Sequence, residues 1–269
     1  MNKTIEILMS AMHQTDASLV TASRARTDIV LVNQCDREEL QTLTYTDEAG
    51  QHHTATIVST RERGLSRSRN MAIRHATADI CVIADDDEVF DDAYADIILK
   101  AYEDYPEADI IAFQVENDIK LTYPDKPARV EYKRAMQTYS WEITFRRQRI
   151  IDKGISFDEE MGSGTGHGAC EEIKFLFDSL RRGLRIQYVP MMIARLHKDS
   201  ASQWFHGYDR RYFFNQGWAT RRFLGPFFAT LYAFYYGWRK RKLYQSDISM
   251  PTAIAYILKG ICHRKYPEK

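Results

Sequence analysis

Residues 79–90, DICVIADDDEVF, place a run of acids directly after a short apolar segment, and this pattern limits what the chain can fold into. The apolar run from Ile80 to Ala84 has the length and branched side chains of a buried strand. The four acids at 85–88 would repel one another at the mouth of such a strand unless something compensated their charge. A divalent cation is a suitable partner, because hard cations bind carboxylate oxygens and often share them with phosphates.

The segment therefore predicts a metal-assisted enzyme that acts on a phosphorylated or nucleotide-linked substrate. Acids also favour the start of a helix, so capping of the following helix is an alternative role for the same four residues.

Length and composition fit one large α/β domain with a C-terminal extension. The chain has 269 residues, of which 37 are basic and 37 acidic, and this balance offers no case for nucleic-acid binding. The N-terminal residues lack the pattern of a signal peptide, and the four cysteines form no CxxC pair. No apolar run reaches the roughly 18 to 20 residues that a membrane span needs. We expect a cytoplasmic protein with reduced thiols.

Strand-like and helix-like segments alternate along the chain, which predicts a mostly parallel α/β sheet. Ligands of such sheets gather at the carboxyl ends of the strands, where Asp36 and the acid cluster would lie. The expected strands are 5–9, 29–32, 53–58, 80–84, 110–115, 143–151 and 186–189, and the expected helices are 16–26, 65–76, 91–104 and 170–182.

Two further features point to a ligand. Four glycines between residues 162 and 168 make a loop that we expect to be mobile and to approach a ligand closely. Arg69 lies among apolar residues of the expected helix 65–76, so its guanidinium needs an anionic partner. A diphosphate would satisfy its forked donors, and a salt bridge to a nearby carboxylate, the acid cluster included, is equally consistent.

Three stretches, taken in order, resemble a family-two glycosyltransferase of the GT-A fold, of the bacterial surface-polysaccharide type. They are similar to the family's sugar-nucleotide helix, its Asp-x-Asp metal motif, and its acid pair with a glycine–strand–proline tail. The resemblance covers about residues 3–200 and implies a Rossmann-like nucleotide-sugar-binding fold with a mostly parallel central sheet. The stretches are GLSRSRNMAI (64–73), DICVIADDDEVF (79–90) and GHGACEEIKFL with RRGLRIQYVP (166–190).

The resemblance also implies an inverting enzyme that uses a UDP-linked sugar donor with Mn²⁺ or Mg²⁺. On this basis Glu172 is the expected general base and Glu171 the second candidate, although both also fit an ordinary acidic first turn of a helix. The expected donor-binding residues are Ser10, Asp36, Arg67, Arg69, Asp85 and Asp86. The expected metal ligands are Asp85, Asp87 and His197, with Asp87 the principal contact; for His197 a structural role is the alternative.

Residues 201–269 differ in character from the expected catalytic domain at 1–200, and we expect them to form a helical extension. The stretch FLGPFFATLYAFYYGWRKRK (223–242) is aromatic and ends in four basic residues. One interpretation is a helix at a membrane interface, in which 221–242 contacts anionic headgroups at the inner face of the cell membrane. The other is a helical pair packed on the catalytic domain or on a second subunit of a homo-oligomer.

Three classes of function fit these observations. The first is a glycosyltransferase that moves a sugar to a glycan or lipid-linked oligosaccharide acceptor, as in cell-surface polysaccharide synthesis. The second is a metal-dependent nucleotidyltransferase, which normally begins with a glycine-rich basic loop, whereas HQTDAS (13–18) follows the first expected strand. The third is a non-catalytic nucleotide-sugar-binding scaffold, for which loss of the acids is expected. We predict the first, because both groups of acids are present.

Overall fold

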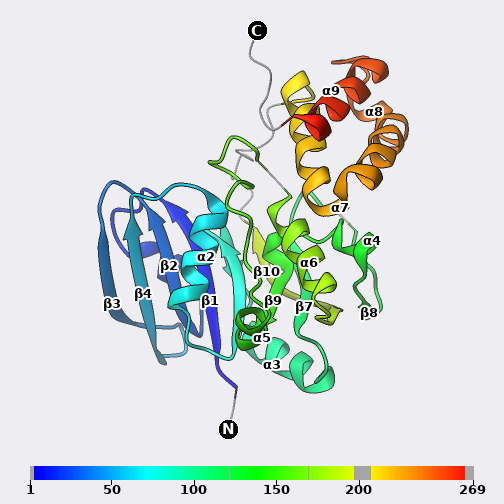
Figure 1. Ribbon diagram of the computed structural model, residues 1–269. Helices are drawn as coiled ribbons and strands as arrows, with labels where there is room; N and C mark the ends of the chain where they lie inside the picture. The colour runs from blue at the N-terminus through cyan, green and yellow to red at the C-terminus, as the bar shows by residue number, and fades with distance from the viewer. Residues whose placement is uncertain (1–2, 121, 169, 197–206, 264–269) are drawn as a thin grey trace.

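The computed structural model describes residues 3–120, 122–168, 170–196 and 207–263, which form a central mixed sheet covered by helices (Figure 1). The strands are β1 (Ile5–Met12), β2 (Asp28–Gln34), β3 (Glu39–Thr46), β4 (His52–Thr60), β5 (Ile80–Asp85), β6 (Glu88–Phe90), β7 (Ile110–Glu116), β8 (Ala128–Arg129), β9 (Ile143–Arg146) and β10 (Ile186–Leu196). The helices are α1 (Ser18–Ala22), α2 (Leu65–His75), α3 (Tyr94–Asp104), α4 (Tyr132–Ala135), α5 (Arg147–Asp152), α6 (Glu171–Arg181), α7 (Arg210–Arg239), α8 (Arg241–Tyr244) and α9 (Met250–Cys262), with a 3-10 turn η1 (Ser140–Glu142).

The order of neighbouring strands in the sheet is β3-β4-β2-β1-β5-β9-β7-β10-β6, and β8 pairs with β10. Strands β4, β2, β1 and β5 are parallel to one another, and β9 is inserted antiparallel between β5 and β7. The expected α/β class with a mostly parallel core is therefore confirmed. In Figure 1 the carboxyl ends of the parallel strands face the side of the molecule on which the C-terminal helices lie.

Both faces of the parallel strands are buried, because helices cover the sheet on each side. Along β1, Leu8 packs into the core beneath α2 and α6, whereas Ile7 and Met9 pack into the core beneath α1 and α3. This two-sided burial is the reason that the strands appear in the sequence as continuous apolar runs rather than as alternating patterns.

Several expected elements have different limits in the structure. The expected strand 143–151 is wrong in its second half, because β9 ends at Arg146 and α5 follows. Past that point only Ile150 is buried, whereas a strand facing the core with alternate residues would also bury residues 148 and 152, which are exposed. Helix α3 begins at Tyr94 rather than at residue 91, and β10 continues to Leu196. Strands β3 and β6 were not expected.

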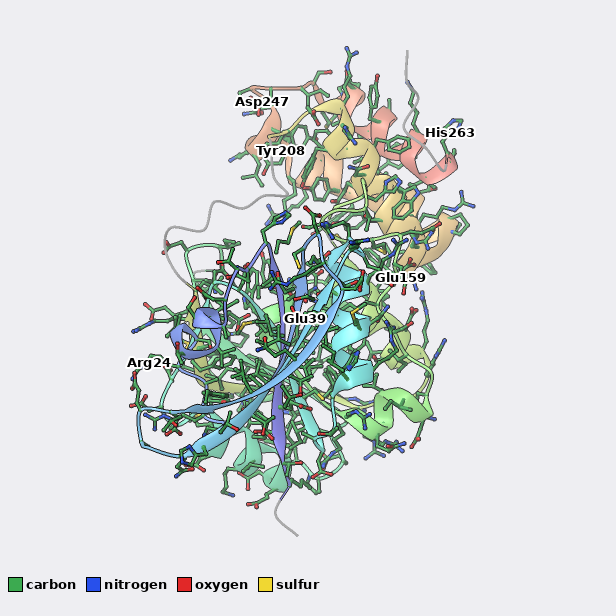
Figure 2. All side chains as sticks on the ribbon, turned by 90° about the vertical axis from the view of Figure 1, so that its left-hand side faces the viewer. Arg24, Glu39, Glu159, Tyr208, Asp247 and His263 are labelled. Carbon is green, nitrogen blue, oxygen red and sulfur yellow. The ribbon has the colours of Figure 1, made fainter. Side chains whose placement is uncertain are left out.

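The C-terminal helices form a unit with its own small core at the end of the molecule away from the N-terminus, where Figure 2 marks Asp247 and His263. Helices α7 and α9 cross in close contact, because a Cβ at Gly217 would overlap the Ile257 carbonyl and a Cβ at Gly260 would overlap that of Phe214. Helix α7 is interrupted at Gly225, whose φ of 76° and ψ of 165° are not helical.

The first half of α7 also packs against the α/β part of the molecule, since Phe214, Trp218 and Phe223 belong to the core that contains α2 and α6. Arg222 strengthens this contact through paired hydrogen bonds from its guanidinium to Asp158, at 2.6 to 2.9 Å. Among the described residues, no helix is long and apolar enough to cross a bilayer.

Candidate active site

The ends of β1, β2 and β5 bring several predicted residues to one edge of the sheet. Ser10 of β1 lies in register with Asp85, the last residue of β5. The Ser10 side chain is buried, and its hydroxyl accepts a hydrogen bond from the Ser68 hydroxyl of α2 at 2.8 Å. Asp36 follows β2 and is exposed, and it accepts a hydrogen bond from Arg63 Nη2 at 2.7 Å. At this edge the Ser10 hydroxyl is therefore buried and hydrogen-bonded, whereas the Asp36 carboxylate remains accessible to solvent.

The four acids after β5 occupy two different environments. Asp85, Asp86 and Asp87 keep part of their surface exposed, whereas Glu88 begins β6 and is only 2 % exposed. Glu88 Oε1 accepts a hydrogen bond from the Asp85 backbone N–H at 3.0 Å, which closes the turn. Burial, reinforced by the Asp85 charge, raises the pKa of Glu88 well above its ordinary value. Glu88 is thus a structural member of the turn, whereas the other three acids keep part of their surface accessible to solvent.

Desolvation raises the pKa of Asp86, and repulsion from the Asp85 and Asp87 carboxylates adds to this rise. The raised pKa of Asp86 reflects the repulsion among neighbouring carboxylates that the sequence predicts for this turn. A bound cation would reduce this repulsion.

Arg69 of α2 joins the acid turn to the acid pair on α6. Its side chain is fully buried, with Nη2 donating to Asp85 Oδ1 and Nη1 donating to Glu171 Oε1, both at 2.9 Å. The guanidinium also lies 5.4 Å from the ring centre of Phe157. Of the two kinds of partner considered for Arg69, the carboxylate is present in the structure. A contact between Arg69 and a donor phosphate stays a prediction.

Glu171 and Glu172 form the first turn of α6, after Cys170 at a φ of 70°. Glu171 is buried and is held by Arg69, and its second carboxylate oxygen has no hydrogen-bond partner among the described residues. Glu172 keeps part of its surface exposed. Burial, followed by repulsion from Glu171, raises the pKa of Glu172 to about 8. The two glutamates therefore differ, with Glu171 fixed by an ion pair and Glu172 available to a ligand.

The glycine-rich loop is fastened to the start of α2. Ser163 O accepts a hydrogen bond from the Leu65 N–H at 2.9 Å, and Met161 O accepts one from the Ser66 hydroxyl at 2.8 Å. Gly162 has a φ of 93°, and a Cβ there would lie 3.3 Å from the Glu171 carboxyl carbon. Glycine is therefore required at this position both by the backbone conformation and by the close approach to the acid pair.

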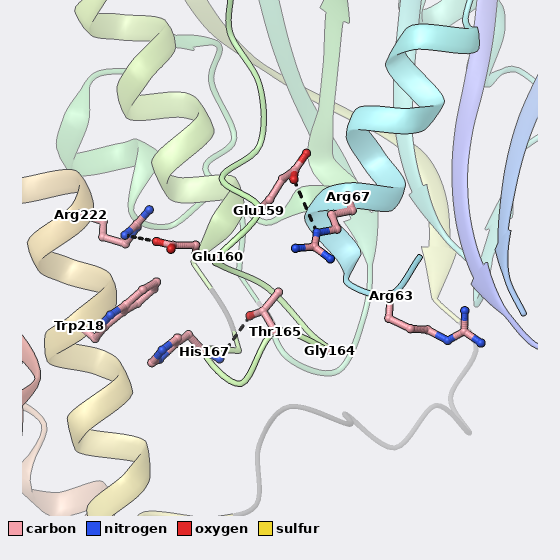
Figure 3. A pocket seen from close by; sticks show the side chains of 9 residues that line it. All are labelled: Arg63, Arg67, Glu159, Glu160, Gly164, Thr165, His167, Trp218 and Arg222. Carbon is pink, nitrogen blue, oxygen red and sulfur yellow. Dashed lines mark hydrogen bonds and ion pairs between the residues drawn. The ribbon is translucent and has the colours of Figure 1, made fainter. Parts of the chain in front are cut away.

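Beyond this loop, a pocket of about 690 Å³ opens between the start of α2, the loop and the first half of α7 (Figure 3). Arg67 enters it from α2 and lies 3.6 Å from Glu159, while Arg222 enters from α7 and lies 2.7 Å from Glu160. His167 stacks on Trp218 with ring centres 3.8 Å apart. The pocket is completed by Arg63, Gly164 and Thr165.

The donor groups at the acid turn fit a cation shared with a ligand. Among the described residues, no three His, Cys, Asp or Glu side chains are arranged as a complete metal site. Mg²⁺ needs fewer protein ligands, because it is usually bound by one or two carboxylates together with substrate phosphates. Asp85 and Asp87 supply such carboxylates in a turn where negative charge already accumulates. His197 lies outside the described residues.

The structure brings some of the predicted residues together and separates others. Asp85, Arg69 and Glu171 are in direct contact, and Ser10 lies on the strand next to Asp85. Arg67 instead lines the pocket of Figure 3, where it projects from α2 toward Glu159. The roles of all these residues in binding stay predictions.

Sequence reasoning missed the contribution of Glu88, which shapes the turn, and of Tyr139, which stacks on Trp141 with ring centres 4.7 Å apart. Tyr139 lies close enough to Glu172 for that carboxylate, after desolvation and Glu142, to raise its pKa. The signal for Glu88 was the Val-Phe that follows it, which marks a short strand. No sequence pattern links Tyr139 to the acid pair.

Known proteins resemble this chain in sequence or in fold. The model of the family described as Glycosyl transferase family 2 matches residues 5–173. No curated protein matches the chain. Among solved structures, S. aureus TarS 1–349 matches with a TM-score of 0.57 at 12 % identity, over 81 % of this chain and 65 % of that one. The same protein in complex with UDP-GlcNAc gives 0.58 at 13 % identity, over 81 % and 66 %.

The chain thus spans just under two thirds of TarS 1–349, and at these identities the likeness establishes the fold alone. That fold is the expected GT-A fold. The family match extends from β1 into the first turn of α6, so it includes α2, the acid turn and the acid pair. With more than half of its length matched, the chain belongs to glycosyl transferase family 2.

Proposed function

We propose that the protein transfers a sugar from a UDP-linked donor to a hydroxyl group of a glycan or lipid-linked acceptor, with inversion at the anomeric carbon. The observation that carries the proposal is the ion-pair bridge from Asp85 through Arg69 to Glu171. This bridge holds a turn suited to a diphosphate beside a pair of carboxyl groups suited to proton transfer. UDP and UDP-GlcNAc are bound by the structurally similar TarS, which supports the choice of donor.

Asp85 and Asp87 would hold Mg²⁺ or Mn²⁺ together with the donor diphosphate. When bound, the cation supplies positive charge that neutralises the leaving nucleoside diphosphate. The chain itself contributes the buried Arg69, which holds the Asp85 carboxylate in place through an ion pair at 2.9 Å. Glu88 keeps the turn closed through its bond to the Asp85 backbone.

Glu172 is the proposed general base, which takes the proton from the acceptor hydroxyl as its oxygen attacks the anomeric carbon. Attack from the side opposite to the departing UDP inverts the configuration. A carboxyl group with a raised pKa suits this task, because a stronger base accepts the proton more readily. Glu171 is held by Arg69 and positions the start of α6.

The acceptor is proposed to approach from the side of the glycine loop that carries the pocket of Figure 3. The loop residue Gly162 contacts Glu171, so a group bound in this pocket lies across one loop from the acid pair. The pocket is lined by guanidinium groups from α2 and α7 and by the carboxylates that pair with them, so its lining is polar and suits the hydroxyl groups of a sugar acceptor. Such groups occur in surface polysaccharides and in lipid-linked precursors.

Isothermal titration of the full chain with UDP tests the donor site. UDP should bind with Mn²⁺ or Mg²⁺ present, more weakly with EDTA, and more weakly in Asp87→Asn than in the parent protein. The control is Asp125→Asn, an exposed acid outside the site, which should bind as the parent does. Equal UDP affinity in all of these conditions would refute the metal assignment. Preference for another nucleoside diphosphate would refute the UDP assignment.

Transfer itself requires a second measurement, which is release of UDP from UDP-sugars in the presence of candidate acceptors. Tight metal-dependent binding of UDP without release on any acceptor or on water would support a nucleotide-sugar-binding scaffold instead.

A further inference from the structure

The second half of α7, residues 226–239, carries most of its large apolar side chains on its exposed face. Pro226 starts this half after the break at Gly225, where its missing N–H is harmless. We call residues 226–239 the outer half of α7. It packs on α9 and turns its other face away from the rest of the described chain.

The inward face of the outer half carries three small residues together with the buried Tyr236. Ala229, Ala233 and Gly237 recur at four-residue spacing and are buried against α9, where Gly237 lies under Ile254. The outward face carries the large apolar residues, which are 53 to 69 % exposed: Phe227, Phe228, Leu231, Phe234, Tyr235 and Trp238. Together with Leu243 they make up seven of the fifteen exposed large apolar side chains in the described chain, so this is a concentrated patch and not a random scatter.

The surroundings of this aromatic patch are strongly basic. Arg239, Lys240, Arg241 and Lys242 follow it directly and are all exposed, and the Arg241 guanidinium lies 5.6 Å from the Trp238 ring centre. Residues 210–263 contain nine Lys or Arg residues and one acid, Asp247. Because the whole chain is neutral, the remainder carries the balancing negative charge.

Two surfaces can cover an exposed aromatic face, a second copy of the chain or a lipid bilayer. A contact between two copies through this patch would bring two positively charged units together and would leave residues 239–242 almost without acidic partners, because residues 210–263 contain a single acid. An anionic bilayer offers the opposite charge together with an apolar interior. Phe, Tyr and Trp beside Lys and Arg are the side chains that settle at the boundary between headgroups and acyl chains.

We propose that the outer half of α7 docks the protein on anionic phospholipid, with its aromatic face among the upper acyl chains and residues 239–242 on the headgroups. The helix lies along the surface, which agrees with the finding that no described helix is long and apolar enough to span a bilayer. The first half of the same helix supplies Trp218 and Arg222 to the pocket of Figure 3. Docking therefore places the pocket close to lipid-linked acceptors, although the docking itself does not depend on the transfer reaction.

Co-sedimentation of the full chain with vesicles tests the proposal without donor, metal or acceptor. The parent protein should bind vesicles that contain one-third phosphatidylglycerol at low salt, bind more weakly at about 0.15 M salt, and bind pure phosphatidylcholine poorly. Replacing Arg239, Lys240, Arg241 and Lys242 with Gln should weaken binding by more than about tenfold. So should the triple change Phe227→Gln, Leu231→Gln and Phe234→Gln, which alters only exposed side chains.

Matched controls separate this surface from general stickiness. Leu40→Gln and Ile119→Gln alter exposed apolar residues elsewhere and should leave vesicle binding unchanged. Circular dichroism of each variant verifies that it is folded. Vesicles with brominated acyl chains should quench the tryptophan fluorescence of the parent, and Trp238→Phe should lose most of this quenching.

Two results would overturn the proposal. One is a parent protein that does not bind anionic vesicles at low salt. The other is a parent protein that is a dimer in sedimentation velocity and a triple glutamine variant that is a monomer but binds vesicles as the parent does. This result would assign the patch to contact between two copies of the chain.

Discussion

Asp85 at the end of β5 and Glu171 at the start of α6 are bound by the same guanidinium, each with one carboxylate oxygen 2.9 Å from a terminal nitrogen of Arg69. The two acids come from elements 86 residues apart in the sequence, yet their separation is fixed by the width of one planar group. A guanidinium can do this because its donors point in defined directions, which an ammonium group does not provide.

Arg69→Met should destabilise the protein strongly, because it leaves Glu171 buried without a partner. Loss of one member of a buried ion pair usually costs about 3 to 5 kcal/mol. Urea unfolding of the variant measures this loss. Arg67→Met is the matched control, since Arg67 lies two residues away but pairs with Glu159 at the surface, and an exposed pair contributes about 1 kcal/mol or less. Equal effects of the two changes would contradict a bridging role for Arg69.

Glu172→Gln should reduce turnover by about two to four orders of magnitude while donor affinity stays nearly unchanged, because the amide keeps the shape but cannot take a proton. Glu171→Gln should lower stability more than Glu172→Gln does, since Glu171 is the partner of Arg69. Transfer rates, donor affinity and melting temperature of both variants distinguish these roles. If Glu172→Gln is active while Glu171→Gln is stable but inactive, Glu171 rather than Glu172 is the general base.

The pH dependence of transfer should show the raised pKa of Glu172. A general base acts in its deprotonated form, so kcat/KM should rise with pH and level off above about 8. Below that pH the rate should fall about tenfold per unit. The residual activity of Glu172→Gln should lack this rise. A profile in the parent that is flat between pH 6 and pH 9 would contradict the assignment.

The same group should make stability depend on pH. The pKa of Glu172 is raised from 4.5 to about 8 in the folded protein, so between these values the folded state holds a proton that the unfolded state has released. Stability therefore decreases through this window as pH rises. Glu172→Gln removes the effect, so its melting temperature relative to the parent should increase from pH 5 to pH 9. An unchanged difference would show that the Glu172 pKa is not raised.

For Gly217→Ala, helix propensity and the contact between α7 and α9 predict changes in stability of opposite sign. Helix propensity alone predicts that alanine stabilises α7 by about 1 kcal/mol. The structure predicts destabilisation instead, because the added Cβ would overlap the backbone carbonyl of Ile257 on α9 and backbone cannot move as a side chain can. Thermal unfolding decides between the two. Ala255→Gly, on the exposed side of α9, is the control in which propensity should act alone.

The parallel core could be predicted from the sequence because its strands are buried on both faces. An unbroken apolar run such as Ile80 to Ala84 is too short for a typical helix and too apolar for a surface loop, so a buried strand is what remains. Strand β3 could not be predicted in this way, since its residues are mostly exposed and carry no apolar run. That strand exists because its backbone pairs with β4, and backbone pairing leaves no mark on the side-chain pattern.

The candidate site was predictable where a motif is local and unpredictable where it depends on contact between distant elements. The acid turn and the acid pair are each contiguous in the sequence, so their residue types indicated them directly. That Arg69 is shared between them, or that Glu88 turns inward to hold the Asp85 backbone, follows only from how α2, β5 and α6 pack. An ion pair for Arg69 could be foreseen as one of two possibilities, but the sequence alone could not choose between them.

The separation of charge between the C-terminal helices and the rest of the chain has a consequence for motion in solution. The molecule is neutral overall, but its positive and negative charges lie at different ends. The electric field of an anionic surface therefore exerts a torque on it. The torque acts within about 8 Å of the surface, because dissolved salt at physiological ionic strength screens electric fields over a Debye length of about that size. The protein would thus rotate to present residues 239–242 shortly before it lands, so most collisions would begin in one orientation.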